Sequence, residues 1–193
     1  MGNSNHIIRA LKPEETIRMQ DIIFRSVTTA DIPELKELFC NTVLTVNARD
    51  YTTEEVADWA SCGNRPGHWE KLFATLHFIA ACNGQGRIIG FTSIRNDGYL
   101  HSMFIHKDYQ RQGIASALLH RIEAYAAKHG ISEITSEVSI TARPFFEKQG
   151  YIVELEQRAQ ANRLQLINYK MRKQMKDGNT GFEKVYQMPL GKV

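Results

Sequence analysis

The stretch that decides the fold runs from Met103 to Leu119 and reads MFIHKDYQRQGIASALL. It predicts a short apolar strand, a turn, and a loop around Gly113 that opens an amphipathic helix. The backbone N–H groups at the start of such a helix have no helical partner, so they form a ready site for a diphosphate. This stretch therefore indicates that the chain binds a nucleotide-like cofactor.

The glycine spacing in this loop excludes two common nucleotide-binding motifs. The dinucleotide fingerprint Gly-x-Gly-x-x-Gly is absent, because Gly113 is the only glycine there, and the phosphate loop Gly-x-x-x-x-Gly-Lys-Ser/Thr is absent too. The pattern that does match is Gln110-x-x-Gly113-x-Ala115. It resembles the acyl-CoA signature of the GNAT N-acetyltransferase superfamily.

A second block supports this resemblance. Ser139–Tyr151 reads SITARPFFEKQGY and resembles the later GNAT motif, in which a short helix leads into a strand. The two motifs occur in the family's order, and the resemblance covers roughly residues 21–173. The chain also resembles a bacterial subgroup of the family that has Phe, here Phe146, in place of the usual Tyr.

The composition is that of an ordinary globular protein. The chain has 193 residues, of which 42% are hydrophobic and 23% charged, and its net charge is +3. This charge is too small to indicate a nucleic-acid partner, and no apolar run is long enough to cross a membrane. The polar N-terminus lacks a hydrophobic signal region, so we expect a cytoplasmic protein. Three widely separated cysteines, with no Cys-x-x-Cys pair and no histidine at metal-ligand spacing, predict no metal site.

The apolar patterns predict an α/β fold. The GNAT resemblance implies a central mixed, mostly antiparallel sheet with helices on both faces. Residues 21–173 are expected to form this domain, preceded by an extension (1–20) and followed by a tail (174–193). The run Thr52–Glu55 predicts a capped helix start. The expected strands after it are 77–82, 87–94, 99–105, 131–139, 151–157 and 164–171.

The resemblance implies where acetyl-CoA would lie. In the family the strand before the loop separates from its neighbour, and the coenzyme occupies the gap. The backbone of Met103 and Ile105 would then pair with the pantetheine, and the amides from Arg111 to Ser116 would hold the pyrophosphate. The full set of cofactor-binding residues predicted in this way is Met103, Phe104, Ile105, Arg111, Gln112, Gly113, Ile114, Ala115, Ser116, Ser139 and Phe146.

Two residues are candidates for proton transfer. Strand periodicity predicts that Tyr99, His101 and Met103 share one face of the strand beside the acetyl group. His101 has a side chain that can take a proton near neutral pH. Tyr169 lies on the last strand and is the second candidate. Phe146 has no proton to give where the family usually has Tyr, so the general acid stays unassigned.

The resulting hypothesis is an N-acetyltransferase that moves the acetyl group of acetyl-CoA directly to a primary amine of a small molecule or peptide. Because the usual Tyr is missing at Phe146, a non-catalytic acyl-CoA-binding sensor is one alternative. The other alternative is an acyltransferase that uses a longer acyl-CoA. No nucleic acid or membrane partner is expected, and the edge of the last strand offers a surface for a homodimer.

Overall fold

A seven-stranded sheet organises residues 19–175, the part of the chain that the computed structural model describes. The strand order is β1-β2-β3-β4-β5-β7-β6, and every neighbouring pair is antiparallel except β4 and β5. The α/β prediction with a mostly antiparallel sheet is therefore confirmed. The strands are β1 (Ile23–Ser26), β2 (Leu76–Cys82), β3 (Ile88–Arg95), β4 (Tyr99–Ile105), β5 (Glu133–Ser139), β6 (Ile152–Gln160) and β7 (Gln165–Gln174).

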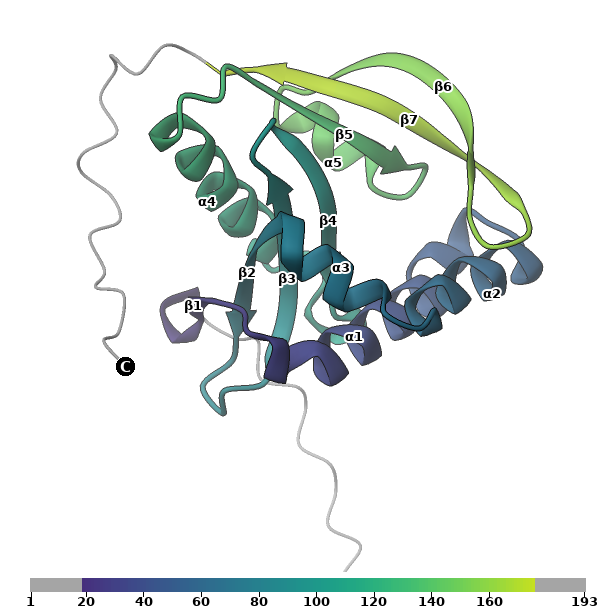
Figure 1. Cartoon of the computed structure of the whole chain (residues 1–193), viewed down its shortest axis with the longest axis horizontal. Coiled ribbons are helices and arrows are strands. Elements are labelled where there is room, and N and C mark those ends of the chain that lie inside the picture. The colour runs from purple at the N-terminus through teal and green to yellow at the C-terminus, as the bar shows by residue number, and fades with distance from the viewer. Residues whose placement is uncertain (1–18, 176–193) are drawn as a thin grey trace, which may run out of the picture.

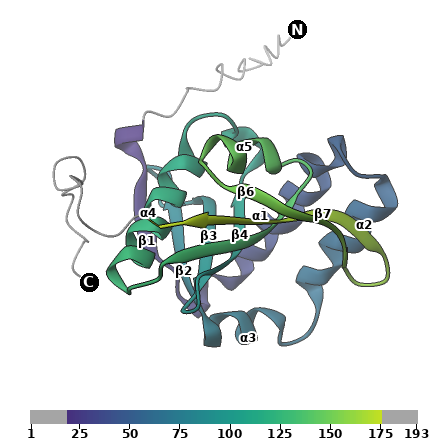
Figure 2. The same ribbon diagram turned by 90° about the horizontal axis from the view of Figure 1, so that it is seen from above.

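Helices cover both faces of the sheet, and Figure 2 shows α3 and α5 on opposite sides of the strands. Along β2, Phe78 and Ala80 pack in the core beneath α1–α3, whereas Ala81 packs with α4 residues on the other face. This alternation follows from the two-residue period of a strand. The helices are α1 (Ile32–Thr45), α2 (Thr53–Ser61), α3 (His68–Thr75), α4 (Ile114–Lys128) and α5 (Arg143–Lys148).

The sheet divides into two halves at the parallel pair β4–β5. In Figure 1, β2, β3 and β4 stand upright, whereas β5, β6 and β7 run obliquely across the top. Two apolar cores lie beneath the helices, and each takes residues from both halves of the sheet. The core under α1–α3 includes Phe91 of β3, and a second core beneath α4 and α5 includes Val138 of β5 and Met171 of β7. The two cores therefore join the halves of the sheet on either side of the short β4–β5 pairing.

Local sequence signals explain where several helices begin and end. The predicted capping box at the start of α2 is present: the Glu55 amide donates to Thr52 Oγ1 at 3.2 Å, and the Thr52 amide donates to Glu55 Oε2 at 2.8 Å. The last turn of α4 ends at Gly130, whose φ of +69° is the left-handed conformation that glycine adopts at low cost. Both signals were readable from the sequence.

The sheet has its edges at β1 and β6, so the prediction that the last strand, β7, forms an exposed edge is wrong. Strand β7 inserts between β5 and β6 and pairs with both of them along its length. Both of its edges are therefore occupied, and β6 carries the free edge on this side of the sheet. Three apolar side chains of β6, namely Ile152, Val153 and Leu155, are exposed.

The predicted extension (1–20) and tail (174–193) lie almost entirely outside the described residues. Strand β7 includes Gln174, and the amide of Met175 donates to the Ser132 carbonyl at 2.8 Å. Within residues 19–175 no helix is long and apolar enough to cross a membrane. Cys40, Cys62 and Cys82 are free thiols. The same residues contain no cluster of three metal-ligating His, Cys, Asp or Glu side chains.

Candidate active site

Strands β4 and β5 pair over a very short length and then separate (Figure 1). Their only paired positions are Tyr99 with Thr135 and Leu100 with Ser136. The Ser136 hydroxyl donates to the Leu100 carbonyl at 2.8 Å, at the last paired position. Beyond it lies a cavity of about 760 Å³ lined by both strands, by α1–α3, by the loop before α4 and by α5. This volume is within the range of cofactor and small-molecule sites.

The β4 backbone presents hydrogen-bonding groups to this cavity. The amide of His106 donates to Ile89 of β3, and Phe104 faces Phe91, so alternate residues of β4 bond to β3. In an antiparallel ladder the residues between them direct their N–H and C=O groups the other way. Met103 is such a residue, and it lines the cavity. An extended ligand can therefore pair with this backbone edge as a strand would.

The second such residue, Ile105, has its carbonyl oxygen already occupied. Gln110 Nε2 donates to it at 2.6 Å and Thr42 Oγ1 at 3.1 Å. Gln110 thus ties the end of β4 to the loop that follows. Gln110, the first residue of the predicted motif, therefore positions the loop through its side chain. The backbone amides of the loop remain available to a ligand.

The prediction that Tyr99, His101 and Met103 share one face of β4 is wrong. Ser102 pairs with Ser93, but the next β3 residue, Ile94, pairs with Leu100, so His101 is an extra residue. Such a bulge shifts the alternation by one position. Met103 consequently packs with Leu100 against the α4–α5 core. The rings of Tyr99 and His101 remain neighbours, with centroids 6.0 Å apart.

The loop before α4 has the geometry of an anion site. Arg111 has a φ of +62°, and within residues 19–175 it is the one non-glycine residue with a positive φ; Gly113 follows at +83°. The first helical bond runs from the Ala117 amide to the Gly113 carbonyl, and no side chain caps the helix. The amides just before Ala117 therefore have no helical partner. Of the predicted loop residues, those that line the cavity are Arg111, Gly113, Ile114, Ala115 and Ser116.

Positive charge accompanies these amides. Arg111 and Lys148 both line the cavity, and Lys148 of α5 was not predicted from the sequence. Lys107 is different, because its Nζ lies 2.6 Å from the carboxylate of Asp108. Gln112 is not among the lining residues, and its Nε2 donates to the Asp108 carbonyl at 3.3 Å. We call the part of the cavity at Arg111–Ser116 the loop end.

At the other end of the cavity, where β4 and β5 still pair, three polar side chains meet. Tyr99 and His101 of β4 and Glu137 of β5 all line it, and we call this the pairing end. Within residues 19–175 Glu137 is the one carboxylate of the cavity lining. Asn168 Nδ2 lies 3.4 Å from Glu137 Oε2. Sequence reasoning missed Glu137, because only the β4–β5 pairing brings it near His101.

The His101 imidazole is poised to be neutral. It lines the cavity, and the surrounding protein desolvates it enough to lower its pKa to about 4, helped by the positive charges of His68 and Arg95. Its Nδ1 lies 2.7 Å from Ser102 Oγ. A ring that is neutral at pH 7 and partnered on one nitrogen can accept a proton on the other.

Aromatic side chains form the wall opposite the sheet. Trp59 of α2 lines the cavity, and its ring centroid lies 5.7 Å from that of Tyr51 and 6.3 Å from that of Phe104. The Tyr51 hydroxyl donates to the Ile167 carbonyl at 2.7 Å, which links this wall to β7. Trp59 thus lines the cavity and also packs against the core beneath α1–α3.

The remaining predicted residues have different placements. Phe146 and Ser139 both line the cavity, and Phe146 also packs edge-on against Tyr151 with centroids 5.1 Å apart. Tyr169 does not line the cavity; it is 9% exposed and packs in the core beneath α4 and α5. The Arg143 guanidinium lies 4.5 Å from the centroid of the Tyr169 ring.

Comparison with known proteins agrees with this geometry. Residues 47–173 match the model of the acetyltransferase (GNAT) domain family. The chain is 31% identical to the uncharacterized N-acetyltransferase YafP of Escherichia coli K12 over 155 residues, which cover 80% of this chain and 97% of YafP.

Solved structures share the fold. A GCN5-related N-acetyltransferase from Rhodopseudomonas palustris superposes with a TM-score of 0.77 at 23% identity, covering 82% of this chain and 98% of its own. PaiA N-acetyltransferase from Thermoplasma acidophilum, solved with coenzyme A, gives 0.64 at 21% identity, covering 79% and 98%. The family match, the YafP similarity and the separated strands lead to one conclusion: the chain belongs to the GNAT family and is an N-acetyltransferase.

Proposed function

We propose that this protein transfers the acetyl group of acetyl-CoA directly to a primary amine of a small molecule or peptide. The observation that carries the proposal is the gap between β4 and β5, which joins an anion-binding loop to a pair of side chains suited to an amine. The loop end would hold the coenzyme and the pairing end the acceptor. Both substrates would then meet beside Met103.

The donor side of the proposal rests on backbone groups. The amides from Gly113 to Ser116, together with the Arg111 guanidinium, suit the pyrophosphate of acetyl-CoA. The backbone edge at Met103 suits the amides of the pantetheine arm. An N–H group of the same edge, directed at the thioester carbonyl, would stabilise the negative charge that develops on its oxygen.

On the acceptor side, the amine must be deprotonated before it can react. A free alkylammonium has a pKa of about 10.4, as lysine does, so at neutral pH it has to lose a proton before it can attack. Glu137 would attract the ammonium, and neutral His101 would accept its proton, directly or through water. The uncharged amine nitrogen then attacks the thioester carbon.

The tetrahedral intermediate collapses by breaking the C–S bond. Its electron pair leaves on the sulfur of coenzyme A, the nitrogen gives its second proton to that thiolate or to water, and the amide product retains the acetyl group. Phe146 cannot protonate this sulfur, but a thiol pKa of about 8.5 allows it to leave as a thiolate. Tyr169 is a weaker candidate for proton transfer than His101, because its ring is packed in the core and does not line the cavity.

Two measurements test the proposal together. Calorimetric titration with acetyl-CoA is compared between the wild type and Gly113→Trp, and we expect micromolar binding that the substitution abolishes. Coenzyme A release is then followed with butylamine, 2-phenylethylamine, spermidine and a peptide with a free N-terminus. Chromatography is the suitable detection, because Cys40 and Cys62 would also react with a thiol reagent.

Each outcome decides between the alternatives. Binding with amine-dependent release of coenzyme A supports the transferase. Binding without release by any amine supports a non-catalytic acyl-CoA sensor, and tighter binding of a longer acyl-CoA supports a different donor. A folded wild type that binds no acetyl-CoA overturns the proposed use of this cavity.

A further inference from the structure

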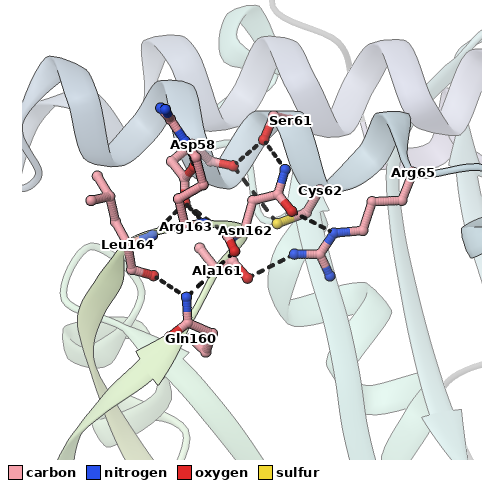
Figure 3. A network of polar contacts seen from close by, with 9 residues as sticks. All are labelled: Asp58, Ser61, Cys62, Arg65, Gln160, Ala161, Asn162, Arg163 and Leu164. Atoms are coloured by element: carbon pink, nitrogen blue, oxygen red, sulfur yellow. Dashed lines mark hydrogen bonds and ion pairs between the residues drawn. The ribbon is translucent and has the colours of Figure 1, made fainter.

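Asp58 of α2 is a buried carboxylate with an unusually complete set of partners (Figure 3). Its Oδ2 accepts three consecutive backbone N–H groups of the β6–β7 turn, from Asn162 at 3.0 Å, Arg163 at 2.7 Å and Leu164 at 2.9 Å. Its side chain is 1% exposed. A buried carboxylate is stable only when its charge is satisfied in this way, so the turn and Asp58 depend on each other.

The same turn has a second attachment, to the segment that follows α2. Arg65 Nη2 donates to the Ala161 carbonyl at 2.7 Å, and Arg65 Nε donates to Asn162 Oδ1 at 3.1 Å. Asn162 Nδ2 in turn donates to Ser61 Oγ at 3.0 Å. Figure 3 shows these groups converging between helix and turn. We call this set of contacts the α2–turn clamp.

The α2–turn clamp joins two segments that both line the cavity. Trp59 and Cys62 line it from the α2 side, and Gln160 and Ala161 line it from the turn. Trp59 and Cys62 directly follow the clamp residues Asp58 and Ser61, whereas Ala161 is itself a clamp residue. The loop end at Arg111–Ser116 contributes no residue to these contacts.

The clamp also adjoins the pairing end of the cavity. The His68 amide donates to the Arg65 carbonyl at 3.2 Å, so the clamp segment leads directly into the start of α3. His68 lines the cavity and acts electrostatically on His101. The wall that the clamp holds therefore lies on the side of the cavity assigned to the acceptor.

We propose that Asp58 is a positioning residue for the acceptor: it fixes the β6–β7 turn on α2, so that Trp59, Gln160 and Ala161 form one closed wall. This inference rests on the proposed function, because it takes the pairing end as the acceptor site. Without the carboxylate, three backbone N–H groups lose their shared partner, and the turn separates from α2. Acceptor binding then weakens, whereas the coenzyme site keeps its geometry.

The test compares Asp58→Asn with Glu54→Gln, a matched substitution of an exposed carboxylate on the same helix. Hydrogen exchange is read at the amides of Asn162, Arg163 and Leu164. We expect exchange there to accelerate about tenfold in Asp58→Asn, as the loss of a charged hydrogen-bond partner implies. Glu54→Gln should leave it unchanged. Calorimetry should give the same acetyl-CoA affinity for all three proteins.

Steady-state kinetics with 2-phenylethylamine separates positioning from a general structural role. Asp58→Asn should raise the KM for the amine about tenfold while kcat changes much less, because the wall binds the acceptor but takes no part in the chemistry. Arg65→Ala, which removes only the second attachment, should give a smaller rise. A parallel loss of acetyl-CoA affinity, or equal falls in kcat and kcat/KM, would overturn the proposal.

A readout without any acceptor keeps the inference separate from the proposed function. In a Trp69→Phe background, Trp59 is the remaining tryptophan, and acrylamide quenching reports its exposure. We expect stronger quenching when Asp58→Asn is added. If no amine is acetylated but exchange and quenching both change, the acceptor assignment fails while the clamp stands. Unchanged exchange and quenching in a folded Asp58→Asn variant would refute the clamp itself.

Discussion

Leu100 and Ser136 are the last residues through which β4 and β5 pair, and the Ser136 hydroxyl lies 2.8 Å from the Leu100 carbonyl oxygen. A side-chain hydroxyl thus occupies a backbone acceptor at the point where the parallel ladder ends. Beyond this point β4 keeps only its β3 neighbour, and its second edge borders the cavity. The gap needed for a strand-like ligand is therefore built into the sheet.

Gly113→Ala should weaken acetyl-CoA binding without a clash. A Cβ at this position would approach only Met19 Sδ, at 3.6 Å, so the cost arises from the φ of +83°. Holding a non-glycine residue in this conformation costs about 1 kcal/mol. The loop can relieve this strain by turning its amides away from the ligand, so we expect an affinity loss of about tenfold. Calorimetric titration measures it.

Gly67→Ala is the control for this prediction. Gly67 has a φ of +68°, precedes α3 as Gly113 precedes α4, and has open space at its Cβ position. Both substitutions should therefore lower the free energy of unfolding by a similar amount, about 1 kcal/mol. Only Gly113→Ala should lose coenzyme affinity. Equal affinities in the two variants would contradict the role given to the loop end.

His101→Gln should remove the base. Because desolvation by the surrounding protein lowers the pKa of His101 to about 4, its imidazole is neutral throughout the neutral range, and the same low pKa makes it a weak base. The wild-type kcat/KM should fall only as pH decreases through about 4, where the ring becomes protonated. We expect His101→Gln to lower kcat by about a hundredfold, the usual scale of general base catalysis. Initial rates between pH 4 and pH 9 check both statements.

His106→Gln serves as its matched control. His106 lies just beyond β4, packs against Tyr109, and does not line the cavity. Its loss should leave the pH profile as it is in the wild type. An acid limb near the ordinary histidine pKa of 6.5, or full activity of His101→Gln, would remove His101 from the mechanism.

Much of this fold could be predicted from sequence because its signals are local. The strand Tyr99–Ile105 was predicted with the bounds observed, because its apolar run ends at the predicted turn after Ile105. The anion loop was visible in Gln110–Ala115, because helix starts and glycine positions are read within a few residues. The capping box at Thr52 belongs to the same class of short-range signal.

What the sequence could not predict depends on partners far along the chain. The bulge at His101 arises from the register with β3, and no periodicity within β4 shows it. Because of this bulge, Met103 lies on the opposite face of β4 from Tyr99. His101 lines the pairing end of the cavity together with Glu137. Asp58 contacts a turn that begins more than a hundred residues later, so its role was invisible to any local pattern.

Glu137→Gln should weaken the amine acceptor specifically. Within the described lining this is the one carboxylate, so its loss removes the negative charge that attracts an ammonium group. We expect the KM for 2-phenylethylamine to rise about fivefold at low salt and less at high salt, since screening already weakens the attraction. Glu156→Gln, on the exposed edge strand β6 and away from the cavity, should have no effect. A KM independent of Glu137 would place the ammonium elsewhere.

The contribution of Asp58 to stability should depend on pH. Hydrogen bonds from the Leu164 backbone first, and from Arg163 and Asn162, lower its pKa from 3.8 to about 2. A carboxyl whose pKa is lower when folded stabilises the fold fully above its unfolded pKa, and this stabilisation is lost as pH falls through the folded value. The wild type should therefore be more stable than Asp58→Asn at pH 7, with the difference shrinking from about pH 4 toward pH 2.

Urea unfolding at several pH values measures this difference directly. Asp31 also has its pKa lowered to about 2, chiefly by its hydrogen bonds with Arg25, but it is present in both proteins and cancels in the comparison. The shrinking difference can therefore be assigned to the turn contacts of Asp58. If the two unfolding free energies stay equally far apart from pH 7 to pH 2, the charge of Asp58 does not hold the turn, and packing of the α2 helix does.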